Sequence, residues 1–279
     1  MNQLLVALDV DTADAANALA DRLRGVVGGF KIGSRLFTSV GPTFVETLTA
    51  RGDRVFLDLK FHDIPSTVAG AVAAATRLGV WMVNVHASGG VAMMRAARAA
   101  ADEEAACCGR AAPLVIAVTM LTSMDQRTTT EVGFADPVAD QVGRLAALAA
   151  AAGLDGVVAS PLEIGIVRRR CGDGFTIVTP GIRDGADERL RGGAAPVQRD
   201  RDRGAGAPAG AERGDGAHAQ RDRGVGAPGV NDDQQRTLSA ADALAAGATY
   251  LVVGRPIIAA ADPRAAAERI AGDCRAKVS

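Results

Sequence analysis

Short apolar segments alternate with alanine-rich helical patterns along almost the whole chain, and this alternation constrains the fold more than any other feature. Eight segments have the length and composition of buried strands: 4–8, 29–32, 55–59, 82–86, 114–118, 156–159, 175–179 and 250–253. Helical patterns lie between them, for example at 13–23, 43–50, 65–78, 137–152 and 263–277. Strands that alternate with helices form parallel sheets. Eight of them predict a closed (β/α)8 barrel, a TIM barrel, with a doubly wound open sheet as the alternative.

Polar side chains stand at the carboxyl end of nearly every predicted strand. They are Asp9, Lys31, Asp58 with Lys60, His86, Thr119 with Thr122, Ser160 and Arg255. In a barrel these strand ends meet on one face, which is where barrel enzymes have their active sites. In a helical bundle the same residues would be scattered. The pattern therefore favours closure of the barrel and predicts an enzyme.

The segment 184–230 differs from the rest of the chain in composition. It contains 11 glycines and 10 alanines, only four Leu or Val residues and no aromatic residue. Such a segment buries too little apolar surface to offset the entropy of ordering it. It also repeats itself, because much of 198–208 returns in shorter form at 220–228. We therefore expect one barrel domain over 1–279, interrupted after its seventh strand by a disordered insertion at about 184–230.

Charge and composition exclude several classes of function. The 31 basic and 32 acidic residues nearly cancel and aromatic residues make up only 3%, so nothing favours nucleic-acid binding. The longest uncharged run, 78–94, is too short and too polar for a membrane span, and the N-terminus lacks the pattern of a signal peptide. The four cysteines show no disulfide framework. These features predict a reduced, cytoplasmic protein that binds neither nucleic acid nor membranes.

The segment 55–65, with the sequence VFLDLKFHDIP, is the densest cluster of reactive side chains. Because side chains on a strand alternate between its faces, Asp58 and Lys60 are expected to point into the barrel together. Asp63 follows in the loop, and a lysine between two carboxylates should keep its proton. Lys60 is therefore a candidate for a positioned ammonium acid. The alternative is a structural ion pair at the end of a strand.

Asp9 and Lys31 extend this cluster onto the two preceding strands. Strand alternation places both side chains on the inward face. Gly29 and Gly33 share the inward phase with Lys31, and we expect them to leave room for a ligand close to the backbone. Together with Asp58 and Lys60 these residues predict an alternating array of carboxylates and ammonium groups. Such an array suits a polar, anionic small molecule.

The eighth predicted strand runs into Gly254, Arg255 and Pro256. In this type of barrel, phosphate sites form after strands seven and eight, from backbone N–H groups and a helix N-terminus. Arg255 would add a charge-assisted hydrogen bond to a phosphate. A plain surface turn is the alternative. The segment predicts that the ligand carries a phosphate group.

Histidines and metal ligands give weaker indications. His62 and His86 are as compatible with packing as with a role in the pocket. No cluster of His, Cys and Asp has zinc spacing. A magnesium site at Asp58 and Asp63 is an alternative, although Lys60 already supplies positive charge between them. We expect no metal.

The ten residues of 58–67, DLKFHDIPST, resemble the signature of the orotidine 5′-phosphate decarboxylase family. Supporting pieces occur in the family's order: ALD at 7–9, FKIG at 30–33, VTMLT at 118–122, TPGIR at 179–183, DQ at 233–234 and VGRP at 253–256. The resemblance spans the chain except for 184–230. It implies a homodimeric TIM barrel with shared active sites and no metal or organic cofactor. The implied reaction converts orotidine 5′-monophosphate to UMP in de novo pyrimidine biosynthesis.

The resemblance also implies roles for single residues. Lys60 resembles the lysine that protonates C6 of the pyrimidine as CO2 leaves, and Asp58 the carboxylate beside the scissile group. Asp63 and Thr67 match residues that reach into the partner subunit's site. The remaining matches are substrate contacts: Asp9 and Lys31 at the ribose, Thr122 at the base, and Arg183, Gln234, Gly254 and Arg255 at the phosphate.

Two positions depart from the family pattern. Ser66 stands where the family usually has Asn, which keeps a hydrogen-bonding group there. The insertion lengthens the loop between Arg183 and Gln234, and we expect deletion of 187–230 to leave the fold intact. Two other functions stay open at this point. One is a magnesium-dependent sugar-phosphate decarboxylase or aldolase of the same barrel type, and the other is a non-catalytic binder of a phosphoribosyl ligand.

Overall fold

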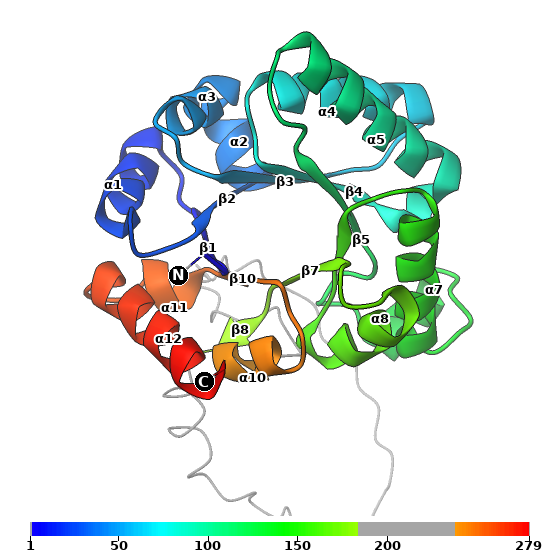
Figure 1. Ribbon diagram of the computed structural model, residues 1–279. Coiled ribbons are helices and arrows are strands. Elements are labelled where there is room, and N and C mark those ends of the chain that lie inside the picture. Colours follow the sequence, from blue (N-terminus) through cyan, green and yellow to red (C-terminus); the bar gives the residue numbers. More distant parts are fainter. Residues whose placement is uncertain (1, 184–237, 279) are drawn as a thin grey trace, which may run out of the picture.

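The structure is a computed structural model that describes residues 2–183 and 238–278. Eight parallel strands close into a barrel in the order β1-β10-β7-β6-β5-β4-β3-β2 (Figure 1). They are β1 (Leu4–Ala7), β2 (Gly29–Gly33), β3 (Val55–Phe61), β4 (Met82–His86), β5 (Leu114–Val118), β6 (Gly156–Val158), β7 (Thr176–Thr179) and β10 (Tyr250–Val253). The predicted closed barrel is confirmed, and the open doubly wound sheet is excluded.

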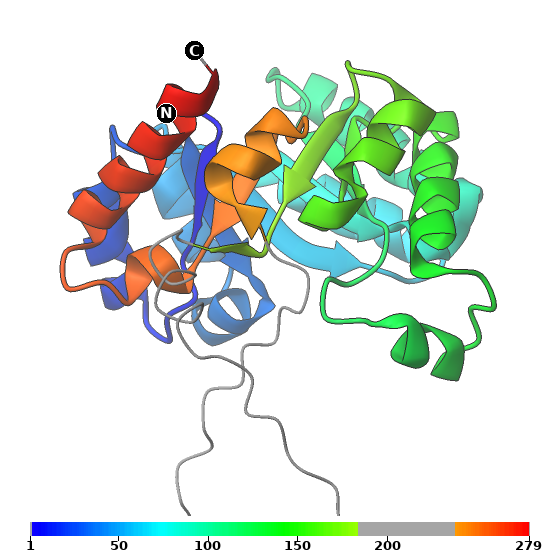
Figure 2. The same ribbon diagram turned by 90° about the horizontal axis from the view of Figure 1, so that it is seen from below.

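Helices surround the barrel as an outer ring (Figure 1). They are α1 (Ala13–Leu23), α2 (Ser34–Val40), α3 (Pro42–Ala50), α4 (Pro65–Arg77), α5 (Gly90–Cys107), α6 (Gln126–Glu131), α7 (Val138–Ala151), α8 (Ile164–Cys171), α10 (Ala240–Ala245), α11 (Arg255–Ile258) and α12 (Pro263–Val278). Short 3-10 turns at Ala87–Gly89 and Pro161–Glu163 precede α5 and α8. Figure 2 shows the barrel from the side, with α6 projecting beyond the end at which the strands finish.

Local sequence explains where several helices begin. The Thr12 side chain accepts a hydrogen bond from the N–H of Ala15 at the start of α1, and Asp125 caps α6 in the same way. Pro65 and Pro263 are the first residues of α4 and α12, as expected for proline in a first turn. Pro137 instead stands one residue before α7, as its N-cap.

The barrel wall separates two hydrophobic layers. Its interior is filled by Leu5, Ala7, Phe56, Met82, Ile116, Val118, Val158, Val178 and Val252. The opposite faces of the strands, including Val6, Val55 and Leu57, pack against the helices. Leu59 is partly buried against the same outer layer, so the predicted inward and outward phases of β3 are confirmed on both sides of Asp58. The interior is packed with side chains, which leaves the ends of the strands for a ligand.

Strand β3 is irregular where its reactive side chains lie. Its register with β4 pairs Leu57 with Val83 and Phe61 with Val85, so three residues of β3 stand opposite one residue of β4. Lys60 lies within this bulge and has a φ of 54°. This left-handed backbone conformation is uncommon for residues other than glycine.

A small second sheet connects to the predicted insertion. Strand β8 (Ile182–Arg183) pairs in parallel with β9 (Leu238–Ser239), with Arg183 opposite Ser239. The insertion at 184–230 and Gln234 lie outside the described residues. The chain therefore leaves the described part at Arg183 and returns beside that point, at Leu238.

Two further expectations concern membranes and cysteines. Within 2–183 and 238–278, no helix has both the length and the apolar character that crossing a bilayer requires. The four cysteines are all free, as their spacing indicated, and Cys274 is buried.

Candidate active site

Four charged side chains from three adjacent strands form a continuous chain of contacts at the mouth of the barrel. Lys31 Nζ lies 3.2 Å from Asp9 Oδ1 and 3.4 Å from Asp58 Oδ2. Lys60 Nζ lies 2.6 Å from the other carboxylate oxygen of the same aspartate, Oδ1. The arrangement follows from the register, in which Ala7 pairs with Lys31 and Gly33 with Asp58. The alternating array expected from the sequence is thus present in the fold.

The four members of this array differ in exposure. The side chains of Lys31 and Asp58 are only 11% and 12% exposed. Their ion pairs must therefore compensate for the hydration that each charge loses on burial. Lys60 is 36% exposed and Asp9 is 48% exposed. A bound molecule could therefore reach the Lys60 ammonium, while Asp58 behind it stays largely shielded from solvent.

Asn84 is a site residue that the sequence analysis did not single out. It lies on β4, is completely buried, and donates a hydrogen bond from Nδ2 to Asp58 Oδ1 at 2.7 Å. Its Oδ1 accepts a hydrogen bond from the backbone N–H of Lys60 at 2.8 Å. The available signal was its inward phase, which it shares with Met82 and His86 on the same strand.

His86 and His62 approach each other beside this array. Their ring centroids are 5.3 Å apart with a tilt of 37°. Burial lowers the pKa of His86 below its ordinary value, and the nearby His62 and Lys60 lower it further, against an opposing effect of Asp58. Burial and the neighbouring positive charge therefore both favour the neutral imidazole at His86.

Asp63 and Thr67 lie apart from the array of their own subunit. Both are exposed, and the Asp63 carboxylate accepts a hydrogen bond from the N–H of Ile64 at 2.6 Å. No ion pair joins Asp63 to Lys60, although the structure describes both residues. Of the two carboxylates expected to flank Lys60, only Asp58 contacts it, because the chain turns at Asp63 to begin α4 at Pro65.

Glycines near the array have different roles. A Cβ atom at Gly33 would lie 3.0 Å from Lys31 Nζ, so this glycine makes room for the lysine itself. At Gly29 a Cβ would lie 2.6 Å from the carbonyl oxygen of Arg54, and the space is taken by the neighbouring backbone. The expectation that Gly29 leaves room for a ligand is therefore wrong.

The end of β10 lies next to the same array. A Cβ at Gly254 would be 3.6 Å from Asp9 Oδ2, which places the Gly254–Arg255 turn beside the first member of the array. Arg255 is exposed and is the first residue of α11.

Three further predicted contacts are only partly covered by the structure. Thr122 is half-buried in the loop after β5. Arg183 is placed by its backbone alone, as the last residue of β8. Gln234 lies outside the described residues.

The described side chains do not gather into a metal site. In 2–183 and 238–278, no group of three or more His, Cys, Asp or Glu side chains is placed to hold a metal ion. Around Asp58, the neighbours are Lys31, Lys60 and Asn84 rather than Asp63. The aspartate pair of the magnesium alternative is not brought together within one subunit.

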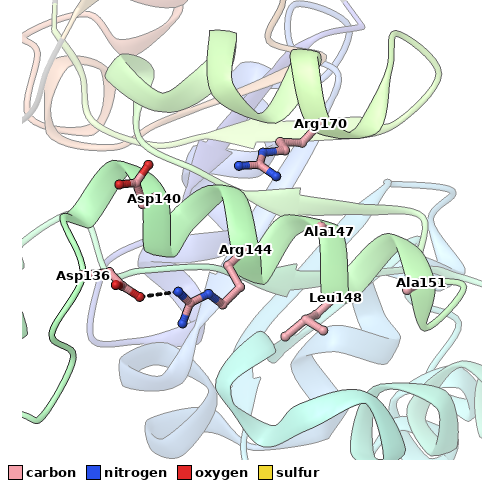
Figure 3. A pocket seen from close by; sticks show the side chains of 7 residues that line it. All are labelled: Asp136, Asp140, Arg144, Ala147, Leu148, Ala151 and Arg170. Atoms are coloured by element: carbon pink, nitrogen blue, oxygen red, sulfur yellow. Dashed lines mark hydrogen bonds and ion pairs between the residues drawn. The ribbon is translucent and has the colours of Figure 1, made fainter.

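A separate pocket of about 580 Å³ opens on the outer helices (Figure 3). It is lined by Asp136, Asp140, Arg144, Ala147, Leu148 and Ala151 on or next to α7 and by Arg170 on α8. Arg144 forms an ion pair with Asp136 there. None of the predicted site residues lines this pocket, so it does not belong to the site at the barrel mouth.

Comparison with known sequences shows to which protein family the chain is similar. The chain matches the profile described as "Orotidine 5'-phosphate decarboxylase / HUMPS family" over residues 2–212 and 197–270. A protein of Moorella thermoacetica named orotidine 5′-phosphate decarboxylase is 48% identical over 273 residues, which cover 98% of this chain and 92% of the relative. One of the same name from Halorhodospira halophila is 47% identical over 274 residues, with 98% and 96% covered.

Solved structures agree in fold. The crystal structure of orotidine 5′-phosphate decarboxylase from Lactobacillus acidophilus has a TM-score of 0.74 and 31% identity, covering 97% of this chain and 98% of that one. The corresponding structure from Pyrococcus horikoshii, at 23% identity and a TM-score of 0.66, shares the fold.

Proposed function

The chain belongs to the orotidine 5′-phosphate decarboxylase / HUMPS family, and we propose that it decarboxylates orotidine 5′-monophosphate to UMP in pyrimidine biosynthesis without a cofactor. The observation that carries this proposal is the Lys60 ammonium, held 2.6 Å from a shielded carboxylate at the barrel mouth. The description of the family has two parts, of which orotidine 5′-phosphate decarboxylase is one. The names of relatives that are 42–48% identical to this chain favour the pyrimidine reaction.

Lys60 is the proton donor in this mechanism. When the substrate carboxylate leaves as CO2, the electron pair of the broken bond stays on C6 of the pyrimidine. The ammonium stabilises that developing charge, donates a proton to C6, and as an amine regains a proton from water. Its 36% exposure fits a group that must meet both the substrate and solvent.

Asp58 occupies the place beside the leaving carboxylate. Its oxygens are held by Lys31, Lys60 and Asn84, so it cannot turn away when a second carboxylate approaches. The repulsion between the two negative charges is relieved as CO2 departs. The same aspartate keeps the Lys60 ammonium aimed at the reacting carbon.

The other predicted residues would hold the nucleotide. Asp9 and Lys31 are assigned to the ribose, and Thr122 to the base. Arg183, Gln234, Gly254 and Arg255 are assigned to the phosphate. The closeness of Gly254 to Asp9 supports a ribose and a 5′-phosphate bound side by side. Phosphate binding far from the reacting bond can lower the barrier if it orders the site.

We also propose a homodimer in which Asp63 and Thr67 complete the partner's site. Both are exposed, and the Asp63 carboxylate accepts a hydrogen bond from the N–H of Ile64 rather than from its own Lys60. Among the described residues, the exposed large apolar side chains are Ile64, Leu121, Val132 and Leu162. Ile64, Leu121 and Leu162 come shortly after the carboxyl ends of β3, β5 and β6, on the face that carries the site. Val132 is the C-cap of α6, in the connection after β5. A second copy covering the site face would bury Ile64, Leu121 and Leu162.

The first experiment measures the absorbance change of orotidine 5′-monophosphate with the purified full-length chain, with and without EDTA. We expect conversion to UMP that EDTA does not affect. The variant Lys60→Ala should lose about 10³-fold in kcat while circular dichroism shows a native fold. Arg169→Ala, at an exposed position on α8, is the matched control and should retain wild-type activity. EDTA-sensitive turnover of a sugar phosphate, with none of the nucleotide, would point to the magnesium-dependent alternative.

Subunit mixing tests the shared site. Lys60→Ala and Asp63→Asn each damage a different half of a site that two subunits build. Mixing the two inactive variants under conditions of subunit exchange should restore activity, because one site of each mixed dimer is intact. Failure to recover activity despite exchange, shown by a tagged subunit, would place Asp63 outside the partner's site.

A further inference from the structure

The bulge of β3 is filled by a single residue of β4. Between the pairs Leu57–Val83 and Phe61–Val85, residues 58–60 of β3 face only Asn84. A bulge leaves backbone groups of the longer strand without their ladder partners. Here the Asn84 side chain takes the place of the ladder and accepts the hydrogen bond of the Lys60 N–H.

Asn84 has the chemistry that this position demands. The Lys60 N–H needs an acceptor and the Asp58 carboxylate needs a donor, and both lie within 2.8 Å of one amide group. Asparagine offers a carbonyl oxygen and an NH2 group on one short side chain. An aspartate could accept but not donate, and an aliphatic residue could do neither. The side chain is completely buried, so water does not compete for these bonds.

The unusual backbone conformation of Lys60 explains why this hydrogen bond matters. Lys60 is the one non-glycine residue with positive φ in 2–183 and 238–278. Such a conformation persists only where its surroundings hold it, and functional sites are where it is found. The hydrogen bond from its N–H to Asn84 is a contact that can hold this part of the backbone in the bulge.

We propose that Asn84 is a positioning residue of the reaction, which fixes the Asp58 carboxylate and the Lys60 backbone at one separation. This inference rests on the proposed function. Asp58 Oδ1 accepts hydrogen bonds from both the Asn84 amide and the Lys60 ammonium. Asn84 therefore orients the carboxylate, and the carboxylate in turn positions the ammonium. Asn84 itself is completely buried, so we assign it a role that acts through these two residues rather than through contact with the substrate. Its loss should therefore affect the chemical step and leave substrate binding largely unchanged.

The first test compares two variants that each remove one buried polar group. We expect Asn84→Ala to lower kcat about 100-fold, as for a misplacement of reacting groups by an ångström, with KM and the Kd for UMP within about threefold. The control is Thr76→Val, which removes a buried hydroxyl that bonds Val72 within α4. It should keep wild-type kcat. A kcat for Asn84→Ala within threefold of the control would overturn the proposal.

A second variant tests the donor function through pH. In Asn84→Asp the introduced carboxyl can still accept from the Lys60 N–H, but at neutral pH it faces Asp58 as a second negative charge. Below the pKa of that pair a shared proton restores the hydrogen bond. The ratio of kcat in Asn84→Asp to wild-type kcat should therefore rise as pH falls. A ratio independent of pH would contradict a donor role for the amide.

A crystal structure of Asn84→Ala gives a readout that does not depend on activity. We expect Lys60 to leave the positive-φ conformation and its contact with Asp58 to lengthen beyond 2.6 Å. An unchanged contact and backbone would overturn the positioning role even if kcat fell. If the wild-type chain did not convert orotidine 5′-monophosphate, the proposed function would fail, and this structure would still decide what Asn84 holds.

Discussion

The imidazole of His86 lies where burial and nearby positive charge both oppose its protonation. Its pKa is lowered from the ordinary value of 6.5 by desolvation first, and then by His62 and Lys60. As pH falls below about 6.5, the unfolded chain binds a proton at this position and the folded chain does not. Acidification therefore favours the unfolded state through His86, and the effect ends below the lowered pKa of the folded state.

The variant His86→Gln should remove this part of the acid sensitivity. We expect the free energy of unfolding of the wild type to fall between pH 6.5 and 5 more steeply than that of the variant. Urea unfolding at a series of pH values measures the difference. Parallel curves for the two proteins would show that His86 does not titrate differently on folding.

Thr179 is a second residue whose environment leads to a prediction. It is fully buried, and its hydroxyl has no hydrogen-bond partner among the described residues. Because Val178 points into the barrel, Thr179 points outward to the helices. Replacement by the isosteric valine should leave the free energy of unfolding unchanged or raise it by up to about 1 kcal/mol.

Thr119 provides the contrast for that experiment. Its hydroxyl is also buried but donates to the carbonyl oxygen of Val158 at 3.0 Å. Thr119→Val should therefore lower the free energy of unfolding by about 1 kcal/mol. Equal effects of the two substitutions in thermal or urea unfolding would refute the assignment of Thr179 as unsatisfied.

At the residue scale, the sequence indicated some site members and concealed others. Asp9, Lys31, Asp58 and Lys60 followed from strand ends and alternation, because those rules need only one strand at a time. Asn84 did not, since its role depends on which residues of β3 stand opposite it, and the bulge sets that register. The role of each glycine also depended on the neighbouring strand or side chain.

At the scale of elements, Arg168 on α8 ties together two loops that lead into strands. Its guanidinium donates to the carbonyl oxygens of Gly247 and Phe175, each at 2.6 Å, and to Thr249 Oγ1 at 3.1 Å. Further bonds run to the carbonyl oxygens of Gly172 and Asp173. These loops precede β7 and β10, at the end of the barrel opposite the candidate site.

Loss of this side chain should reduce stability without affecting turnover. Arg168→Ala leaves several part-buried carbonyl oxygens without their donor, and we expect the free energy of unfolding to fall by about 2–4 kcal/mol. Arg169→Ala on the same helix should change it by less than about 0.5 kcal/mol. Both variants should keep the wild-type kcat at a temperature where they are folded. A loss of kcat in folded Arg168→Ala would contradict the separation of the two ends.

The elements themselves were largely predictable, and the exceptions have physical reasons. The predicted bounds of Ala13–Leu23, Met82–His86, Leu114–Val118 and Tyr250–Val253 are confirmed, because apolar periodicity and flanking caps defined them. Strands β8 and β9 have two residues each, too few for any period to show. The extension of β3 to Phe61 was missed because it depends on the irregular register with β4, which one strand's sequence does not show.

At the scale of the whole molecule, the small β8–β9 sheet beside the barrel brings Arg183 and Leu238 together. Arg183 and Leu238 belong to neighbouring residue pairs of the β8–β9 sheet. The ends are therefore fixed by the fold on either side, whatever the length of chain between them. A fivefold change in the length of such a loop alters its closure free energy by only about 1.4 kcal/mol.

Deletion of 187–230 should consequently leave the fold intact. We expect the shortened chain to give an unchanged circular dichroism spectrum and a KM for orotidine 5′-monophosphate that is unchanged or lower, because a shorter loop has less entropy to lose on binding. Steady-state kinetics of the two chains side by side measure this. A large loss of kcat on deletion would show that the insertion contributes to catalysis.

The closed architecture was predictable because it depends on a count of strands and on polar residues at their ends. The number of subunits was not, since no periodicity in the chain reports on it. The exposed apolar side chains Ile64, Leu121 and Leu162 became an argument for a second copy only once the fold placed them on the site face.

The β8–β9 pair also indicates a place where the chain could be cut without loss of the barrel. Strand β1 begins and helix α12 finishes at the same end of the barrel (Figure 2). Folds with this property accept circular permutation, in which the old termini are joined and new ones opened elsewhere. Because β8 and β9 hold their ends in place, a break between them would remove no strand from the barrel. The covalent order of the chain could then start at β9 and end at β8 with the same barrel formed.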